Sequence, residues 1–223
     1  FACWFIAAFF VYKLSSRLLG QNSALRSLIL FAMLPIFFGS GFIMTPDAPL
    51  IACWAGCLYF FYRALLEDHS TSWYSAGLLL GLGMCSKYTI VFLGPAIILF
   101  MLIHRPARKQ FLRIHPYLAA LVALAVFSPV IWWNYHNEWA SFLFQSKARI
   151  QADPEFSTHL LVASILLLLT PTGFFAAVSI FRKKHAERQS AASVRSKIFM
   201  FCMITALVPL SIFLLFSFTK EVK

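Results

Sequence analysis

Residues 118–145 read LAALVALAVFSPVIWWNYHNEWASFLFQ, and this stretch indicates both the fold class and the place where polar side chains gather. Residues 118–130 carry no charged side chain, and residues 28–44 form a second charge-free apolar run. Apolar runs that approach 20 residues are typical of helices that cross a hydrocarbon layer of about 30 Å. No segment alternates strictly between polar and apolar residues, as the strands of a membrane barrel do. We therefore expect an all-α, polytopic helical membrane protein.

The composition of the chain supports a membrane protein. Of its 223 residues, 61% are hydrophobic and 12% are charged, and the mean hydropathy is +0.78. A water-soluble domain of this size needs more polar residues to cover its surface. The cysteines lie within apolar runs, without a His or an acid at metal-ligand spacing; they are Cys3, Cys53, Cys57, Cys85 and Cys202. We interpret them as small buried hydrophobic residues.

The net charge of +11 is distributed in a way that argues against a nucleic-acid partner. Lysines and arginines cluster in three short segments between apolar runs, at residues 13–26, 105–113 and 182–197. Basic loops of this kind stay on the cytoplasmic side of a membrane and contact anionic lipid headgroups. We therefore expect a multi-pass protein whose basic loops lie inside and whose partners include membrane lipids but no nucleic acid.

Counting crossings from the basic loops predicts about eight membrane segments. Residues 72–103 join two inside segments and must cross an even number of times. We therefore predict a hairpin of two short helices that breaks near GLGMCSKYT (residues 81–89). The count places this break, the turn TPDAPL (residues 45–50) and the stretch after residue 133 on the external side. Single crossings are predicted at residues 1–12, 28–44, 48–65, 115–133, 160–181 (kinked at Pro171 and Gly173) and 198–218.

Two ionisable residues on the external side are candidates for chemistry. Asp47 lies in a tight turn between apolar runs, where it could act as a general base, hold a metal or accept hydrogen bonds from sugar hydroxyls. It could equally be the N-cap of the next helix. Lys87 is the basic residue inside the predicted hairpin, where an ammonium group suits a lipid phosphate. The alternative is that Lys87 extends to the interface beside Tyr88, an aromatic anchor.

The aromatic stretch after residue 130 leaves two interpretations open. Its rings are typical of a belt at the membrane interface; they are Trp132, Trp133, Tyr135 and Trp139. A belt does not explain the polar side chains between the rings, which are Asn134, His136, Asn137 and Glu138. Rings combined with amide and acid groups suit a polar ligand such as a sugar, and His136 could transfer a proton or contact a phosphate. The sequence contains no nucleotide-binding or zinc-protease motif.

Four motifs, in this order and spacing, resemble the bacterial protein-mannosyltransferase-like family of GT-C glycosyltransferases. They are TPDAPL (45–50), GLLLGLGMCSKYT (77–89), SPVIWWNYHNEWASFLFQ (128–145) and TKEVK (219–223). The family includes the aminoarabinose transferase that acts on lipid A and the galacturonosyltransferases that act on lipopolysaccharide. The resemblance covers residues 1–223, as a single transmembrane glycosyltransferase domain.

The resemblance implies transfer of a sugar from a polyprenyl-phosphate donor to a lipid, glycan or protein acceptor, at the periplasmic face of a bacterial inner membrane. It implies that Asp47 lines the catalytic cavity and that Lys87 and Tyr88 lie near the donor phosphate. Substrate-binding roles are implied for Trp133, Asn134, His136, Asn137, Glu138 and Trp139. Relatives often have Asp where this chain has Glu138. The resemblance implies no definite cofactor and leaves a divalent metal open.

In this family the principal catalytic acid lies in the first external loop, and the chain continues beyond the last motif. Because Phe1 already lies in an apolar run, we expect the sequence to be a piece of a longer protein that lacks both parts. Two other classes stay open from the residues alone: a transporter or lipid flippase, and a non-catalytic membrane subunit. A transporter places ionisable residues along a path through the membrane, whereas here they concentrate on the external side.

Overall fold

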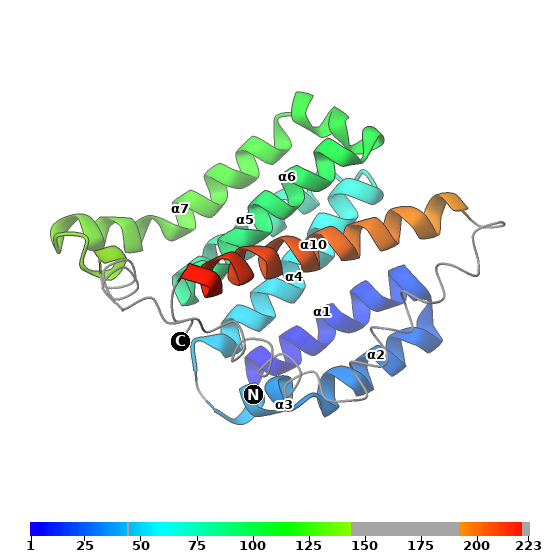
Figure 1. Ribbon diagram of the computed structural model, residues 1–223, viewed down its shortest axis with the longest axis horizontal. Helices are drawn as coiled ribbons and strands as arrows, with labels where there is room; N and C mark the ends of the chain where they lie inside the picture. The colour runs from blue at the N-terminus through cyan, green and yellow to red at the C-terminus, as the bar shows by residue number, and fades with distance from the viewer. Residues whose placement is uncertain (44, 144–191, 220–223) are drawn as a thin grey trace.

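The computed structural model describes residues 1–43, 45–143 and 192–219, and the regular elements in this part of the chain are all helices (Figure 1). Those long and apolar enough to cross a membrane are α1 (Ala2–Leu19), α4 (Asp47–Leu66), α7 (His115–His136) and Ser196–Leu215 within α10 (Ala192–Thr219). The shorter ones are α2 (Gln21–Met33), α3 (Pro35–Phe42), α5 (Ser72–Ser86), α6 (Leu93–Ile103) and the 3-10 helices η1 (Tyr88–Phe92) and η2 (Arg105–Leu112). The predicted all-α, polytopic class is confirmed.

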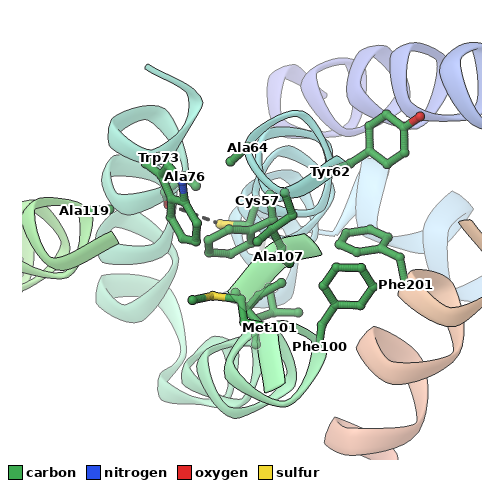
Figure 2. Packing of buried hydrophobic residues seen from close by; sticks show 14 of the residues in the cluster. Cys57, Tyr62, Ala64, Trp73, Ala76, Phe100, Met101, Ala107, Ala119 and Phe201 are labelled. Atoms are coloured by element: carbon green, nitrogen blue, oxygen red, sulfur yellow. Dashed lines mark hydrogen bonds between the residues drawn. The ribbon is translucent and has the colours of Figure 1, made fainter. Parts of the chain in front are cut away.

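The helices pack side by side around α4, which lies between α1 and α5, while α7 covers the other side of α5 (Figure 1). In Figure 2 the rings of Phe100 and Phe201 join α6 to α10, with their centroids 5.5 Å apart. On the other side of the same core, the Cys57 thiol of α4 lies 3.6 Å from the carbonyl oxygen of Ala76 in α5. Helices in lipid associate through such close packing, because lipid tails are as apolar as the side chains themselves.

Glycines allow α5 and α7 to approach very closely. A Cβ atom added at Gly77 would collide with the carbonyl of Ala119, and one added at Gly81 would lie 2.7 Å from the carbonyl oxygen of Ala123. The two glycines are four residues apart, as are the two alanines. A row of small residues on α5 therefore packs against a row of small residues on α7. This is the close packing typical of membrane helices with small residues at that spacing.

The predicted hairpin in residues 72–103 is confirmed, with its break at Lys87. α5 ends at Ser86, Lys87 takes an extended conformation (φ −155°, ψ 128°), and η1 and α6 run back along the bundle. With 15 residues, α5 is only about 22 Å long, which is shorter than the hydrocarbon layer. A helix that ends so early needs protein groups around its terminus.

The predicted crossing at residues 28–44 is wrong in its bounds. The chain turns at Gly20 (φ 83°), where a positive φ is easy for glycine, and α2 already begins at Gln21. Pro35 then separates α2 from α3. A residue before proline disfavours the helical conformation, so Leu34 is extended (ψ 125°) and Pro35 begins the next helix.

The predicted end of α7 at residue 133 is also too early, because the helix continues to His136. Residues 137–139 form a turn and residues 140–143 are helical again, so the external stretch predicted after residue 133 begins as helix and not as a loop. The polar residues after Trp133 therefore belong to a structured helix end and not to a long loop.

Two further predictions concern the later part of the chain. The predicted crossing at residues 160–181, with its kink at Pro171 and Gly173, lies outside the described residues. The predicted crossing at residues 198–218 falls entirely within α10.

Charged side chains gather at the end of the bundle where α1, α4 and α6 finish. There Asp68 accepts hydrogen bonds from Lys109 (2.9 Å), Gln110 (2.9 Å) and Arg113 (2.6 Å). The side chains of Lys109 and Arg113 lower the pKa of the Asp68 carboxyl group, because they favour its charged form. Beside this cluster, Glu67 pairs with cations of α1 and α4.

These pairs at Glu67 join Arg17 Nη1 at 2.5 Å and Arg63 Nε at 3.5 Å. The basic segments at residues 13–26 and 105–113 thus meet at one end of the bundle, as the crossing count predicts. The opposite end carries the ion pair of Asp47 and Lys87. Which end faces the cytoplasm stays a prediction from the positive-inside rule.

Candidate active site

An open cavity of about 630 Å³ lies at the end of the bundle where α4 begins and where α5 and α7 end. Three segments that are far apart in the sequence form it: the turn before α4, the break after α5 and the turn after α7. Its lining residues are Pro46, Asp47, Cys85, Ser86, Lys87, Tyr88, Trp133, Ala140 and Ser141.

The ion pair of Asp47 and Lys87 occupies this cavity. Lys87 Nζ donates to Asp47 Oδ1 at 2.7 Å, and the two side chains are 47% and 49% exposed. Asp47 is the first residue of α4, where the positive end of the helix dipole stabilises a carboxylate. The helix has Pro46 as its N-cap and no side-chain cap hydrogen bond, so the alternative that Asp47 is the N-cap is wrong.

The break of the hairpin brings Lys87 to Asp47. α5 ends because Lys87 is extended, and the Lys87 N–H still donates to the carbonyl of Gly83 at 2.8 Å. Next to it, the Ser86 hydroxyl donates to the carbonyl oxygen of Pro46 at 2.6 Å. This bond connects the end of α5 to the turn before α4. The segments that carry Lys87 and Asp47 are therefore held together next to the ion pair.

Tyr88 packs the break after α5 against α7 and the turn that follows α7. Its ring stacks on that of Phe142, with centroids 5.1 Å apart and an angle of 18°, and meets the edge of Phe127 in α7 at 5.6 Å. Trp133, on the last turn of α7, forms the facing wall and leaves half of its surface exposed. The cavity therefore combines a cation, a carboxylate and two aromatic rings, which suits a ligand with a phosphate and a sugar.

Asn134 is fully buried and organises the turn after α7. Its Nδ2 donates to the carbonyl of Val130 (2.9 Å), and its Oδ1 accepts the backbone N–H of Ser141 (3.1 Å). Its own carbonyl accepts the N–H of Trp139 (2.8 Å), and both Glu138 and Trp139 have left-handed backbones (φ 51° and 59°). Through these bonds the chain doubles back and places Ser141 on the cavity wall.

The remaining residues of the aromatic–amide motif (residues 132–139) lie at the end of α7 and on the exposed turn that follows it, next to the cavity, and do not line it. His136 Nδ1 lies 3.0 Å from the carbonyl oxygen of Trp132, and Asn137 Nδ2 donates to the carbonyl of Trp133 at 2.7 Å. Trp139 packs against Phe142 with centroids 5.9 Å apart. The structure thus brings Asp47, Lys87, Tyr88 and Trp133 into one cavity and leaves His136, Asn137, Glu138 and Trp139 beside it.

Sequence reasoning missed several lining residues, above all Ser86, Ser141 and Cys85. Ser86 stands next to Lys87 in the predicted break, but its partner Pro46 is 40 residues away and no local pattern indicates it. The interpretation of the cysteines as buried holds for Cys53 and Cys57 and is wrong for Cys85, which is exposed and lines the cavity. The hydrophobic run around Cys85 gave no signal of the open space beside it.

Among the described residues, no three His, Cys, Asp or Glu side chains gather as a metal site would require. Asp47 is the carboxylate that lines the cavity in this part of the chain. The chemistry that these residues offer is therefore that of a positive point charge beside a hydrogen-bond acceptor, held against aromatic walls.

Comparison with protein families shows a match over much of the chain. The family model described as dolichyl-phosphate-mannose-protein mannosyltransferase matches residues 1–133, more than half of the chain. The matched region includes Asp47, Lys87 and Tyr88, and it ends at Trp133. Comparison with curated proteins gave no match, and neither did comparison with solved structures.

Proposed function

Because the chain belongs to the dolichyl-phosphate-mannose-protein mannosyltransferase family and is thus a glycosyltransferase of the GT-C type, we propose that it takes its sugar from a polyprenyl-phosphate donor. The acceptor is a hydroxyl group of a lipid, a glycan of the lipopolysaccharide kind or a protein. The reaction takes place in the cavity beside Asp47 and Lys87, at the periplasmic face of a bacterial inner membrane. The proposal rests on the position of the Lys87 ammonium group. It lies 2.7 Å from Asp47 in an open cavity, at the break between the two short arms of the hairpin.

Lys87 is assigned to the donor phosphate. When the sugar is transferred, the bond between its anomeric carbon and the phosphate oxygen breaks, and negative charge develops on the leaving phosphate. A fixed ammonium group next to that oxygen stabilises the charge as it forms. Lys87 is half exposed and points into the cavity, so a phosphate can reach it without displacing packed side chains.

Asp47 is assigned two tasks. Its Oδ1 holds Lys87 in position through the ion pair. Its carboxylate also accepts hydrogen bonds from hydroxyl groups of the sugar or the acceptor. The acceptor oxygen forms the new bond to the anomeric carbon, and its proton passes to a carboxylate acting as general base. In the family that the chain resembles the principal acid lies in the first external loop, so we assign Asp47 a supporting role.

The aromatic–amide motif is assigned to the substrate side. Tyr88 and Trp133 provide apolar walls for the faces of the sugar ring, on which C–H groups pack well. His136, Asn137, Glu138 and Trp139 extend this surface on the exposed turn and contact the part of the substrate that leaves the cavity. A donor that arrives on a lipid needs no nucleotide site, in agreement with the lack of a nucleotide motif in the sequence.

Sugar transfer by the full-length enzyme tests these assignments. We expect Lys87→Ala to lower the turnover of a polyprenyl-phosphate-linked sugar by about 100-fold, the usual cost of losing one group that stabilises developing charge. Asp47→Asn keeps the shape of the side chain but lowers turnover as well, because it loses the charge that holds Lys87. Lys13→Ala is the matched control, because Lys13 is an exposed lysine of α1 that does not line the cavity.

Unchanged turnover in both Lys87→Ala and Asp47→Asn would contradict the assignments. The ion pair is half exposed, so neither substitution should change the free energy of unfolding by more than about 1 kcal/mol. A thermal unfolding curve for each variant therefore separates loss of chemistry from loss of the fold.

A further inference from the structure

The 3-10 helix η2 lies across the end of the bundle opposite the cavity. It joins α6 to α7 and is turned by 114° from the segment Tyr88–Ile103. Both neighbours run along the bundle, so a connector that crosses between them lies at the membrane surface and in its plane (Figure 1). η2 therefore meets the region where lipid phosphates and the first acyl carbons are found.

One face of η2 is docked on the protein. A 3-10 helix has three residues per turn, so Ala107, Gln110 and Arg113 lie in one row. Ala107 and Gln110 are each 1% exposed, and Gln110 and Arg113 both donate to Asp68 Oδ1. Lys109, in the next row, is also held by Asp68. These contacts fix the helix in one rotation about its axis.

In the other two rows Lys109 is held by Asp68 and Phe111 packs against the core, whereas Arg105, Arg108 and Leu112 are exposed. Arg105 and Arg108 lie one turn apart and are exposed, and no carboxylate of the described residues pairs with either of them. The Arg108 Nε donates to the carbonyl of Leu102 at 2.8 Å, and the side chain remains exposed. Leu112 is 92% exposed, and the next apolar residue along the chain, Ile114, is 63% exposed.

We propose that η2 is an interfacial anchor that binds the headgroups of anionic phospholipids. Arg105 and Arg108 bind the lipid phosphates, for which the planar guanidinium group is well suited. Leu112 and Ile114 insert among the first acyl carbons, where their exposed apolar surface leaves water. The ligand is a lipid surface, because a free phosphate satisfies the two arginines and leaves Leu112 in water. This site lies at the other end of the bundle and does not depend on the proposed function.

Two measurements on the full-length protein in lipid nanodiscs test the proposal. In the first, Leu112→Cys is made in a Cys85→Ser background and labelled with a fluorophore that is sensitive to polarity. We expect blue-shifted emission that is quenched by phospholipids carrying a nitroxide on the upper acyl chain. Emission typical of water would overturn the proposal. Blue-shifted emission without quenching would overturn it too, since another part of the protein would then cover η2.

The second measurement is thermal unfolding in phosphatidylcholine alone and with about one third phosphatidylglycerol, an anionic lipid. We expect phosphatidylglycerol to raise the unfolding temperature of the wild type, and the double variant Arg105→Gln/Arg108→Gln to lose most of that gain. The matched control Lys13→Gln/Arg26→Gln removes two exposed charges near the same end and keeps the gain.

Three outcomes of this second measurement would contradict the proposal. The first is a wild type that does not respond to phosphatidylglycerol. The second is a control that loses as much as the η2 variant, which would indicate attraction by overall charge and no site on η2. The third is an equal stabilisation of the detergent-solubilised protein by inorganic phosphate, which would show that the arginines take a free anion.

Discussion

The ion pair of Asp47 and Lys87 is half exposed to solvent, and exposed pairs contribute little to the free energy of unfolding. What distinguishes the pair is where it lies in the fold. The pair sits at the start of α4 and at the break of the hairpin, where a ligand reaches both charges at once. A phosphate that binds Lys87 competes with Asp47 for the ammonium group and frees carboxylate oxygens for hydroxyl groups of the substrate.

Asp68, at the opposite end, provides a prediction about pH. Its neighbours Lys109 and Arg113 lower its pKa in the folded protein below the value of about 3.9 that is usual for an unfolded chain. A lowered folded pKa stabilises the fold at every pH above the unfolded pKa, and this stability is lost as the pH falls through the folded pKa. Asp68→Asn should therefore unfold at a lower temperature than the wild type at pH 7.

The same reasoning predicts that the difference between Asp68→Asn and the wild type shrinks as the pH falls below about 4, the usual pKa of an unfolded aspartate, because the unfolded chain then takes up a proton before the folded protein does. Thermal unfolding of both proteins in detergent between neutral pH and pH 3 measures this. A difference that stays constant over the whole range would show that the charge of Asp68 is not what stabilises the contact with η2.

Single residues also show where sequence reasoning stops. Asp47 and Lys87 could be predicted to lie on one side of the membrane, because the number of crossings between them follows from the basic loops. Their direct contact could not, since it depends on how the end of α5 packs against the turn before α4. Cys85 shows the same limit: its exposure results from the empty space between three segments, and no pattern in the sequence encodes that space.

At the level of elements, the turn after α7 depends on Asn134. Asn134→Ala removes two buried hydrogen bonds and leaves the N–H of Ser141 without its acceptor, which costs about 1–3 kcal/mol per unsatisfied group. We expect the turn to loosen, and the cavity to open beside Cys85. A polar maleimide should then react faster with Cys85, the exposed cysteine among the five in the chain.

A matched control for Asn134→Ala is Ser128→Ala, which removes an exposed hydroxyl of the same helix whose partner is the carbonyl of Ala125. We expect the control to leave the rate of Cys85 labelling unchanged. An Asn134→Ala variant that is folded and labels at the wild-type rate would mean that Asn134 does not set the cavity wall. The labelling readout does not depend on any sugar transfer.

The contact between α5 and α7 gives a second prediction for an element. Gly81→Ala places a Cβ atom 2.7 Å from the carbonyl oxygen of Ala123, so the two helices must move apart. We expect a loss of about 1–3 kcal/mol in the free energy of unfolding, the usual cost of overpacking. Thermal unfolding in detergent measures it. Gly39→Ala in α3 is the control, because a Cβ atom there has nothing within 4 Å and no proline follows it.

In this comparison Gly39→Ala should be neutral or stabilising by up to about 1 kcal/mol, since alanine is the better helix former. If both variants behave alike, the close approach of α5 and α7 is not needed for stability. The stripe of small residues was present in the sequence, but its partner on α7 could be identified only from the structure. The helix breaks at Gly20 and Pro35 had local signals, whereas the end of α7 depends on the buried side chain of Asn134.

For the whole molecule, the fold separates two kinds of charged surface. One end carries the ion-pair clusters around Glu67 and Asp68 and the basic helix η2. The other end carries the cavity with Asp47, Lys87 and the aromatic walls. The all-α class and this separation could be predicted from hydropathy and the placement of basic residues, because both follow from the cost of burying charge in lipid. The cavity itself arises from tertiary contacts and required the structure.

The central claim is that Lys87 receives the phosphate of a lipid-linked donor, and binding tests it most directly. We would measure the affinity of the full-length protein in nanodiscs for a polyprenyl phosphate and for the uncharged polyprenol of the same length. We expect the wild type to prefer the phosphate by about tenfold or more, as for a charged hydrogen bond, and Lys87→Ala to lose this preference while still binding the alcohol. Equal preference for the phosphate in the wild type and in Lys87→Ala would contradict it.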